Sequence, residues 1–350
     1  MDHGGDIYRN KVNIDFSINL NPMGAPKEVM DGAAAALYKA YVYPDIRQDR
    51  IRGTIADYIG VASWQVCAGS GASELIMALV RAAGPKRALL YEPCFSGYEH
   101  ALKAQGAEIK KHLLKKENGF AIMSEDVRAL TDDVDMVFIC NPGNPSGAVL
   151  DKEVLTQILD RAKEKETFVC LDESFLALSD KGEEMEPGTQ EVLINQYRNL
   201  AIVRSLTKVF ALPGIRMGYL LSGEQNIERV RAQLPEWNLS AIAEGAMEAG
   251  IEVLKRGTFI QKSIAGIKHE RQFLTEKLTE LGMEVFPSDT CFILFEGPEG
   301  LCEKLLARGI LIRNCSSFSG LSGRYYRIAV RDHEDNRALV QAIKEVQSGV

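Results

Sequence analysis

The stretch MVFICNPGNPSG, residues 136–147, joins an apolar run directly to a turn rich in Asn, Pro and Gly. A short apolar run that ends in turn signals is typical of a strand buried on both faces. Similar β-rich runs lie on either side of it in the sequence, and longer amphipathic segments separate them. This alternation predicts an α/β protein with a mostly parallel sheet and helices on both of its faces.

The pattern divides the chain into three parts. The expected strands of the large sheet are 87–92, 107–113, 136–140, 167–171, 200–205 and 217–221, with helices at 73–83, 98–105 and 152–165. After residue 234 come a long helical stretch (240–281), two strand-like runs (291–295 and 326–330) and a closing helix (336–347). We predict a large domain over residues 41–235 and a small α+β domain over 236–350. Residues 1–40, with one helix at 27–39, should pack with the small domain.

The composition is that of a globular protein, with 350 residues, 46% hydrophobic and 25% charged. A net charge of −7 argues against a nucleic-acid partner, so an anionic ligand would need a local basic pocket. The sequence contains no apolar stretch of membrane-spanning length and no signal-peptide core, and we expect a cytoplasmic protein without a membrane partner. The seven cysteines include no CxxC pair, which predicts free thiols and no metal site.

A Gly-rich turn precedes the helix expected at 73–83. The sequence Gly69-Ser-Gly71-Ala-Ser73-Glu74 begins like GxGxxG, but Glu74 occupies the third glycine position, so the dinucleotide fingerprint is absent. Backbone N–H groups and the helix dipole make such a turn a site for an anion. The same residues also fit an ordinary helix start with Ser73 as N-cap. Taken alone, this motif favours the ordinary helix start.

Polar residues follow three neighbouring strands of the predicted sheet. Asn144 follows strand 136–140, Asp172 follows strand 167–171, and the segments Ser205-Leu-Thr-Lys208 and Gly214-Ile-Arg216-Met-Gly218 follow strand 200–205. Each of these, considered singly, fits an ordinary loop. Because the carboxyl ends of parallel strands meet at one edge of a sheet, together they predict a functional site at that edge.

The order of the motifs GSGAS, NPGNPSG, DES, SLTK and GIRMGY resembles that of the fold-type-I pyridoxal-phosphate enzymes, in the class I/II aminotransferase group. Within this group the chain most resembles the L-threonine O-3-phosphate decarboxylases of cobalamin biosynthesis, and next the histidinol-phosphate aminotransferases. The features that favour the decarboxylases are HGG at 3–5, DFSINLNPMG at 15–24, RSLTK at 204–208, and Phe175, where the aminotransferases usually have Tyr. Asp6 and Ser174 depart from the Asn and Ala usual in these groups.

The resemblance implies pyridoxal 5′-phosphate as cofactor, and no metal. It implies that Lys208 attaches the cofactor and moves the proton at Cα, that Asp172 pairs with the pyridine nitrogen, and that Phe95 stacks on the ring. Asn144 would bind the phenolic oxygen, and the phosphate would be held by Gly71, Ala72, Ser73, Ser205 and Arg216. Tyr43 of Tyr43-Pro-Asp45 would reach the phosphate of a second protomer, which implies a homodimer with shared active sites. Without the resemblance, Lys208 fits an exposed strand-end lysine and Phe95 a core residue.

The resemblance also implies a small phosphorylated amino acid as substrate. It assigns the substrate's anionic groups to Arg313 and Arg327, with His3, Gly4, Asn19 and Asn144 around them, although surface exposure is the usual fate of an Arg. Three functions remain open: decarboxylation of O-phospho-L-threonine to aminopropanol phosphate, amino transfer from histidinol phosphate or an aromatic amino acid, and cofactor binding without catalysis. The presence of Lys208 argues against the third. The first two differ in how the substrate is anchored.

Overall fold

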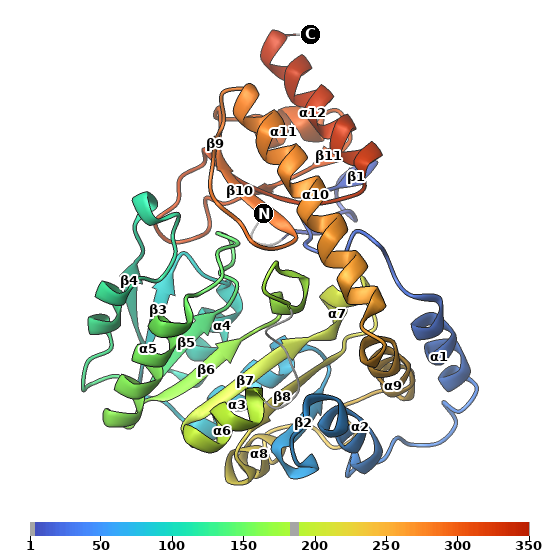
Figure 1. The fold of residues 1–350 in the computed structure, drawn as a ribbon, viewed down its shortest axis with the longest axis vertical. Helices are drawn as coiled ribbons and strands as arrows, with labels where there is room; N and C mark the ends of the chain where they lie inside the picture. Colours follow the sequence, from blue (N-terminus) through green and yellow to red (C-terminus); the bar gives the residue numbers. More distant parts are fainter. Residues whose placement is uncertain (1–3, 183–188, 350) are drawn as a thin grey trace.

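The computed structural model describes residues 4–182 and 189–349, and its centre is a seven-stranded sheet (Figure 1). The strands, in spatial order, are β2 (Val66–Gly69), β8 (Gly218–Ser222), β7 (Leu200–Ser205), β6 (Phe168–Asp172), β5 (Met136–Cys140), β3 (Arg87–Glu92) and β4 (Glu108–Leu113). Strand β8 runs antiparallel to its neighbours β2 and β7, and the other pairs are parallel. The predicted mostly parallel α/β sheet is therefore confirmed. Strand β2 was not predicted, because its short sequence has no distinguishing pattern.

Helices cover both faces of this sheet because its central strands are apolar on both sides, whereas the edge strand β4 is largely polar. On one face, α3 (Ala72–Ala83), α4 (Ser96–Gln105) and α8 (Glu224–Arg231) share an apolar cluster with the strands. On the other face lie α1 (Lys27–Leu37), α2 (Asp49–Ile59), α5 (Lys152–Glu164), α6 (Thr189–Gln196) and α9 (Ala241–Lys255). The buried apolar residues of α1 and α9 thus belong to the core of the large sheet. The domain boundaries expected at residues 40 and 235 stay a prediction.

A smaller antiparallel sheet lies at the other end of the molecule (Figure 1). Its order is β12 (Arg313–Asn314), β13 (Tyr325–Ala329), β10 (Phe292–Glu296) and β9 (Glu284–Val285). The helices α10 (Thr258–Glu280), α11 (Leu301–Leu306) and α12 (His333–Ser348) complete this part. Near the N-terminus, β1 (Ile14–Asp15) pairs in parallel with β11 (Ile310–Leu311), which ties the first segment to this end of the molecule.

The long helical stretch expected at 240–281 consists of two helices, α9 and α10. Gly257 separates them with a φ of +71°, a conformation that glycine adopts without steric cost. Short helical segments elsewhere are α7 (Leu206–Val209) and the 3₁₀ turns η1 (Ser63–Gln65), η2 (Lys116–Asn118), η3 (Ser124–Ala129) and η4 (Leu176–Leu178). Within the described ranges, none of the helices combines the length and the hydropathy that a bilayer span requires.

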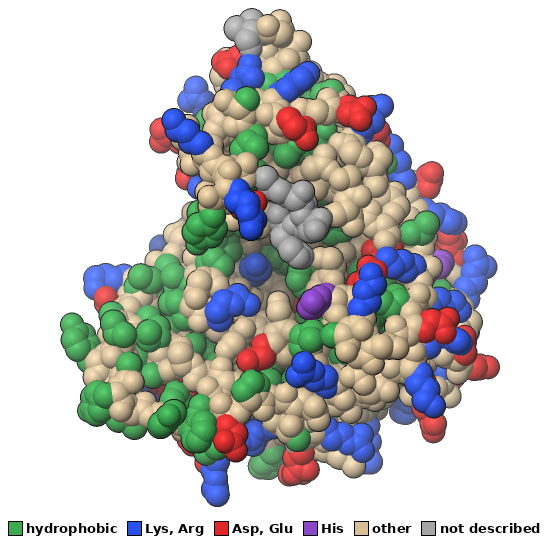
Figure 2. All heavy atoms as spheres, turned by 180° about the vertical axis from the view of Figure 1, so that it is seen from behind, with side chains coloured by type: hydrophobic (Ala, Val, Ile, Leu, Met, Phe, Trp, Pro, Cys, Tyr) green, Lys and Arg blue, Asp and Glu red, His purple; other side chains and the backbone are tan. Residues whose placement is uncertain are grey.

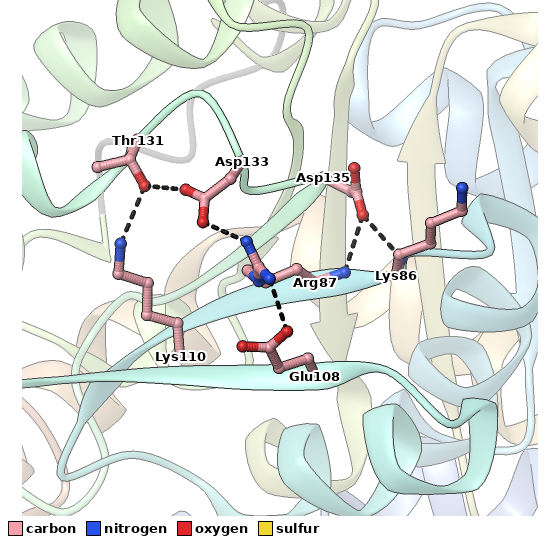
Figure 3. A network of polar contacts seen from close by, with 7 residues as sticks. All are labelled: Lys86, Arg87, Glu108, Lys110, Thr131, Asp133 and Asp135. Carbon is pink, nitrogen blue, oxygen red and sulfur yellow. Dashed lines mark hydrogen bonds and ion pairs between the residues drawn. The ribbon is translucent and has the colours of Figure 1, made fainter.

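A polar network connects the amino ends of β3, β4 and the loop before β5 (Figure 3). The carboxylate of Asp135 accepts hydrogen bonds from the backbone N–H groups of Lys86 (2.7 Å) and Arg87 (2.8 Å). The Arg87 guanidinium also contacts Asp133 and donates to Glu108 at 2.7 Å. Solvent-exposed ion pairs of this kind contribute little stability each. They lie at the amino ends of these strands, which is the edge opposite to the carboxyl ends where the functional residues were expected.

Candidate active site

The carboxyl ends of the central strands open into a cavity of about 240 Å³, bordered on its other side by the small sheet. Most residues that the sequence predicted for the site line this cavity: Gly4, Asn19, Ala72, Ser73, Phe95, Asn144, Asp172, Ser205, Lys208, Arg216, Arg313 and Arg327. They come from segments that lie far apart in the sequence. The residues expected to bind the cofactor and those expected to bind the substrate therefore lie around one cavity.

Three predicted residues need separate comment. Gly71 adjoins the cavity through Arg216, since a Cβ on Gly71 would lie 2.6 Å from Nη2 of Arg216. Tyr43 does not line the cavity; its side chain is 78% exposed and its ring lies 4.9 Å from that of Trp237. His3 lies outside the described residues.

The turn before α3 is shaped to receive an anion. Gly71, with a φ of +83°, is the N-cap of α3, and no side chain caps the helix. The alternative interpretation, with Ser73 as N-cap, is therefore wrong: Ser73 lies within the first helical turn, and it is exposed and lines the cavity. The Gly71 N–H donates to the carbonyl of Gly69 (2.7 Å). The donors left for a ligand are the first-turn N–H groups of α3, which have no acceptor within the helix.

Arg216 adds a cation to this turn. Its backbone is in the left-handed region, with a φ of 64°, which is strained for a residue other than glycine. Its exposed guanidinium donates only to two carbonyl oxygens among the described residues, those of Pro213 (3.1 Å) and Ser70 (3.5 Å). Most of its five donor positions are therefore open to a ligand. Beside it, the hydroxyls of Ser205 and Thr207 are hydrogen-bonded to each other at 2.7 Å.

Lys208 follows β7 and extends into the cavity, so it is not the exposed strand-end lysine of the alternative interpretation. Its Nζ lies 5.9 Å from the centroid of the Phe175 ring. Burial lowers the pKa of Lys208, and the charges of Arg327 and Arg216 lower it further. A lowered pKa increases the fraction of neutral amine, which is the nucleophilic form.

Asp172 lies at the end of β6 and is 5% exposed. Its Oδ2 accepts a hydrogen bond from the Tyr98 hydroxyl (2.6 Å), and its Oδ1 accepts one from the Ser174 N–H (2.9 Å). Burial raises the pKa of Asp172, while the hydrogen bonds from Ser174 and Tyr98 lower it. The ring of Phe95 meets the Tyr98 ring edge-on, with the centroids 5.4 Å apart. Tyr98 thus contacts both Phe95, the residue predicted to stack on the ring, and Asp172, the predicted carboxylate.

Arg327 connects the small sheet to the large one. It is 7% exposed, and it donates to Oδ1 of Asn144 and, at 2.9 Å, to the carbonyl of Ser17. Its Nε has no hydrogen-bond partner among the described residues. Burial lowers the pKa of Arg327 to about 10, and the charge of Arg313 contributes in the same direction. Because Asn144 presents its oxygen to Arg327, its amide nitrogen remains available as a donor.

Arg313 lies beside Arg327 on β12 and is 4% exposed. It donates to the Ser317 hydroxyl at 2.7 Å, and its guanidinium lies 5.6 Å from the centroid of the Phe318 ring. Arg313 and Arg327 are both buried, although arginines usually lie at the surface. Asn19 is also buried next to them, at 3% exposure, and its Oδ1 has no partner in the described part of the chain.

Several residues of the site were not predicted from the sequence, among them Ser17, Tyr98, Thr207, Ser317 and Phe318. Thr207 carried a signal, since it lies within SLTK, and Tyr98 lies close to Phe95 in the sequence. Ser17 contacts Arg327 across 310 positions of sequence, whereas Ser317 and Phe318 contact Arg313 from the loop that follows it. The described lining contains four cations (Lys208, Arg216, Arg313 and Arg327) and one carboxylate, Asp172. A chain with a net charge of −7 thus contains the local basic pocket that an anionic ligand needs.

Comparison with known proteins places this geometry in context. The family described as "Aminotransferase class I and II" matches residues 11–343. The chain is 31% identical to a threonine-phosphate decarboxylase from Salmonella typhimurium, over 96% of this chain and 92% of that protein. It is 30% identical to histidinol-phosphate aminotransferase 2 from Archaeoglobus fulgidus, over 97% and 94%. The crystal structure of the histidinol-phosphate aminotransferase from Clostridium acetobutylicum superimposes with a TM-score of 0.87 at 30% identity, over 96% of this chain and 100% of that one.

Proposed function

The chain belongs to the class I and II aminotransferase family, whose members use pyridoxal 5′-phosphate, and we propose that it decarboxylates O-phospho-L-threonine. The product would be aminopropanol phosphate, for the biosynthesis of cobalamin. The observation that carries the proposal is the pair Arg313 and Arg327, two buried guanidiniums side by side in one cavity. Two such groups suit a substrate with two anionic ends, a carboxylate and a phosphate.

The residues of the cavity fit the cofactor. The first turn of α3 and the open guanidinium of Arg216 form a site for its phosphate, together with the Ser205 hydroxyl. The buried carboxylate of Asp172 would pair with the pyridine nitrogen and keep that nitrogen protonated. Phe95 would lie against the face of the ring. The Asn144 amide would donate to the phenolic oxygen, and Lys208 would provide the amine for attachment.

When bound, pyridoxal phosphate supplies an electron sink for the bond that breaks at Cα of the amino acid. The chain's own residues decide which bond that is. If Arg327 and Arg313 hold the substrate's anions so that the bond from Cα to the carboxylate is the one aligned for cleavage, CO2 would leave, and Lys208 would return a proton to Cα. If they direct the Cα–H to that position, Lys208 removes this proton and amino transfer follows.

Phe175 supports the lyase assignment. It lines the cavity and lacks the hydroxyl that a tyrosine would bring near the cofactor. The phenolic oxygen would then depend on Asn144. This is the residue choice of the decarboxylases that the sequence resembles.

A second candidate is an aminotransferase acting on histidinol phosphate. The observation that favours it is the 0.87 TM-score and 30% identity with the Clostridium acetobutylicum enzyme. The two candidates share the cofactor site and differ in how the substrate is anchored, so the comparisons leave the choice to experiment.

A homodimer with shared active sites belongs to the same proposal. Tyr38, Tyr41 and Tyr43 are 84%, 87% and 78% exposed, and Leu37, Val42 and Ile46 nearby are also exposed. In Figure 2 apolar side chains gather at the lower left, on the side of the molecule where α1 lies. Apolar surface of this kind on a globular protein usually marks an interaction site. Tyr43 would extend from it to the cofactor phosphate of the partner.

The test is a direct comparison of two reactions with purified, cofactor-loaded protein. We expect CO2 release from O-phospho-L-threonine and much slower release from threonine. Transfer of the amino group of histidinol phosphate to 2-oxoglutarate, with no CO2 from O-phospho-L-threonine, would rule out the lyase and support the second candidate.

A further inference from the structure

We propose that Glu74 is a positioning residue for the phosphate of the cofactor. Its carboxylate holds the Ser70–Gly71 turn in the shape that presents the first-turn N–H groups of α3 to the cavity. The inference rests on the proposed function, which assigns Ala72 and Ser73 to that phosphate. Glu74 is the residue that ends the resemblance to GxGxxG, and neither the cofactor nor the substrate assignments use it.

The first contact is within the turn. Oε2 of Glu74 accepts a hydrogen bond from the backbone N–H of Ser70 at 2.7 Å, so the helix residue reaches back to the turn that precedes it. The approach is close: a Cβ on Gly69 would lie 2.6 Å from Cδ2 of Leu75 and 3.1 Å from Oε2 of Glu74. The turn is therefore folded tightly against the first turn of α3, with the Glu74 carboxylate as the link.

The second contact extends to a distant loop. The same Oε2 accepts a hydrogen bond from Nδ2 of Asn238 (2.9 Å), and the Ser70 hydroxyl donates to the Asn238 carbonyl (2.5 Å). Oδ1 of Asn238 in turn accepts from Nε2 of Gln48 at 2.6 Å. Gln48 is 6% exposed and follows the segment that contains Tyr43. A continuous chain of hydrogen bonds thus connects the phosphate turn to the segment proposed to reach the partner's active site.

The charge of Glu74 separates this role from a simpler one. An acidic residue in the first turn stabilises any helix through the helix dipole. If that were its only role, the negative charge would merely repel a phosphate bound at the same helix end. Removing the charge would then tighten phosphate binding. If Glu74 instead holds the turn, removing its acceptor oxygen should weaken phosphate binding despite the lost repulsion.

The experiment measures the affinity of the cofactor-free protein for pyridoxal 5′-phosphate and for pyridoxal, which lacks the phosphate, by absorbance titration. The dissociation constant of pyridoxal divided by that of pyridoxal phosphate measures how much the phosphate contributes to binding. We expect Glu74→Ala to reduce this ratio about tenfold, the size of one hydrogen bond to a charged group. Glu74→Gln should stay within about threefold of the wild type, because its amide oxygen can still accept from Ser70. Glu153→Ala, in the exposed first turn of α5, is the matched control and should change nothing.

Glu74→Asp gives a second, independent test, since it keeps the charge but shortens the side chain by one methylene. We expect Glu74→Asp to lose preference for pyridoxal phosphate over pyridoxal, as Glu74→Ala does. This variant remains informative if Glu74→Ala does not fold. An unchanged ratio in Glu74→Asp or Glu74→Ala, or tighter phosphate binding in both Glu74→Gln and Glu74→Ala, would overturn the proposal. A wild-type protein that does not prefer pyridoxal phosphate to pyridoxal would instead refute the phosphate site itself.

Discussion

Arg313 and Arg327 lie directly opposite each other on the neighbouring antiparallel strands β12 and β13. Like charges in this position destabilise a sheet, and both side chains are less than a tenth exposed. Burying a guanidinium also costs roughly several kcal/mol in lost hydration. An anionic ligand offsets both costs. This cost is one reason why we propose that the pair binds an anionic substrate.

Replacing either arginine by lysine should impair the reaction selectively. Arg313→Lys and Arg327→Lys should each lower kcat/KM for O-phospho-L-threonine by about ten- to a hundredfold, because lysine cannot form two parallel hydrogen bonds to an oxyanion. The substitution at the phosphate-binding arginine should leave kcat/KM for unphosphorylated threonine nearly unchanged. Arg331→Lys is the control, since Arg331 is paired with Asp335 at 2.6 Å. If both variants match the wild type on the phosphorylated substrate, the substrate site is assigned wrongly.

Tyr98→Phe should shift the pH dependence of the enzyme. The Tyr98 hydroxyl donates to the carboxylate oxygen Oδ2 of Asp172 at 2.6 Å, and burial already raises the pKa of Asp172. Loss of this donor raises that pKa further, so Asp172 becomes protonated at a higher pH than in the wild type. The acid limb of the kcat/KM profile, and the absorbance titration of the bound cofactor, should both move to higher pH.

Tyr91→Phe is the matched control for this shift. Tyr91 is also buried in the large sheet, but its hydroxyl donates to the carbonyl of Asp126 (3.2 Å). It should leave both titrations in place. Equal profiles for Tyr98→Phe and the wild type would mean that Tyr98 contributes packing alone.

The contrast between Lys208 and Tyr98 explains how much of the site the sequence could predict. Asp172 ends a strand, and Lys208 and Asn144 each come soon after one. Parallel topology brings the carboxyl ends of strands to one edge of the sheet whatever the details of packing. Tyr98 points to Asp172 across 74 positions of sequence. No local pattern encodes that contact, because it depends on how α4 packs on the sheet.

The same distinction applies to the fold. The large-sheet strands with strong apolar runs were predicted, whereas β2 was missed and α9 and α10 were merged. The merger followed from apolar periodicity on both sides of Gly257, where one positive φ decides the break. The pairing of β1 with β11 joins segments about 300 residues apart, and strands of two residues leave no periodic signal.

Lys208→Met should stabilise the cofactor-free protein. The folded state lowers the pKa of Lys208 from its ordinary value of 10.5, so at neutral pH the charged amine is less favourable in the folded state than in the unfolded chain. Between this lowered pKa and 10.5 the unfolded state binds more protons than the folded state, so the penalty decreases as the pH rises through that window. We expect the variant to melt a few degrees higher at pH 7, roughly, with a smaller difference at higher pH. Thermal melts from pH 6 to pH 10, with exposed Lys86→Met as control, check this; a variant less stable than the wild type at pH 7 would contradict it.

Tyr43→Phe should weaken cofactor retention without changing the fold of the chain. Tyr43 lies outside the cavity of its own chain and is 78% exposed, so a direct contact between its hydroxyl and a cofactor requires the active site of a partner. One hydrogen bond to a charged phosphate contributes about 1.5–3 kcal/mol, which corresponds to a tenfold or greater loss of affinity for pyridoxal phosphate. Tyr41→Phe, at a nearby tyrosine that is 87% exposed, should have no such effect. Sedimentation at the assay concentration completes the test: an active monomer that retains its cofactor, with Tyr43→Phe equal to the wild type, would mean that each chain builds its site alone.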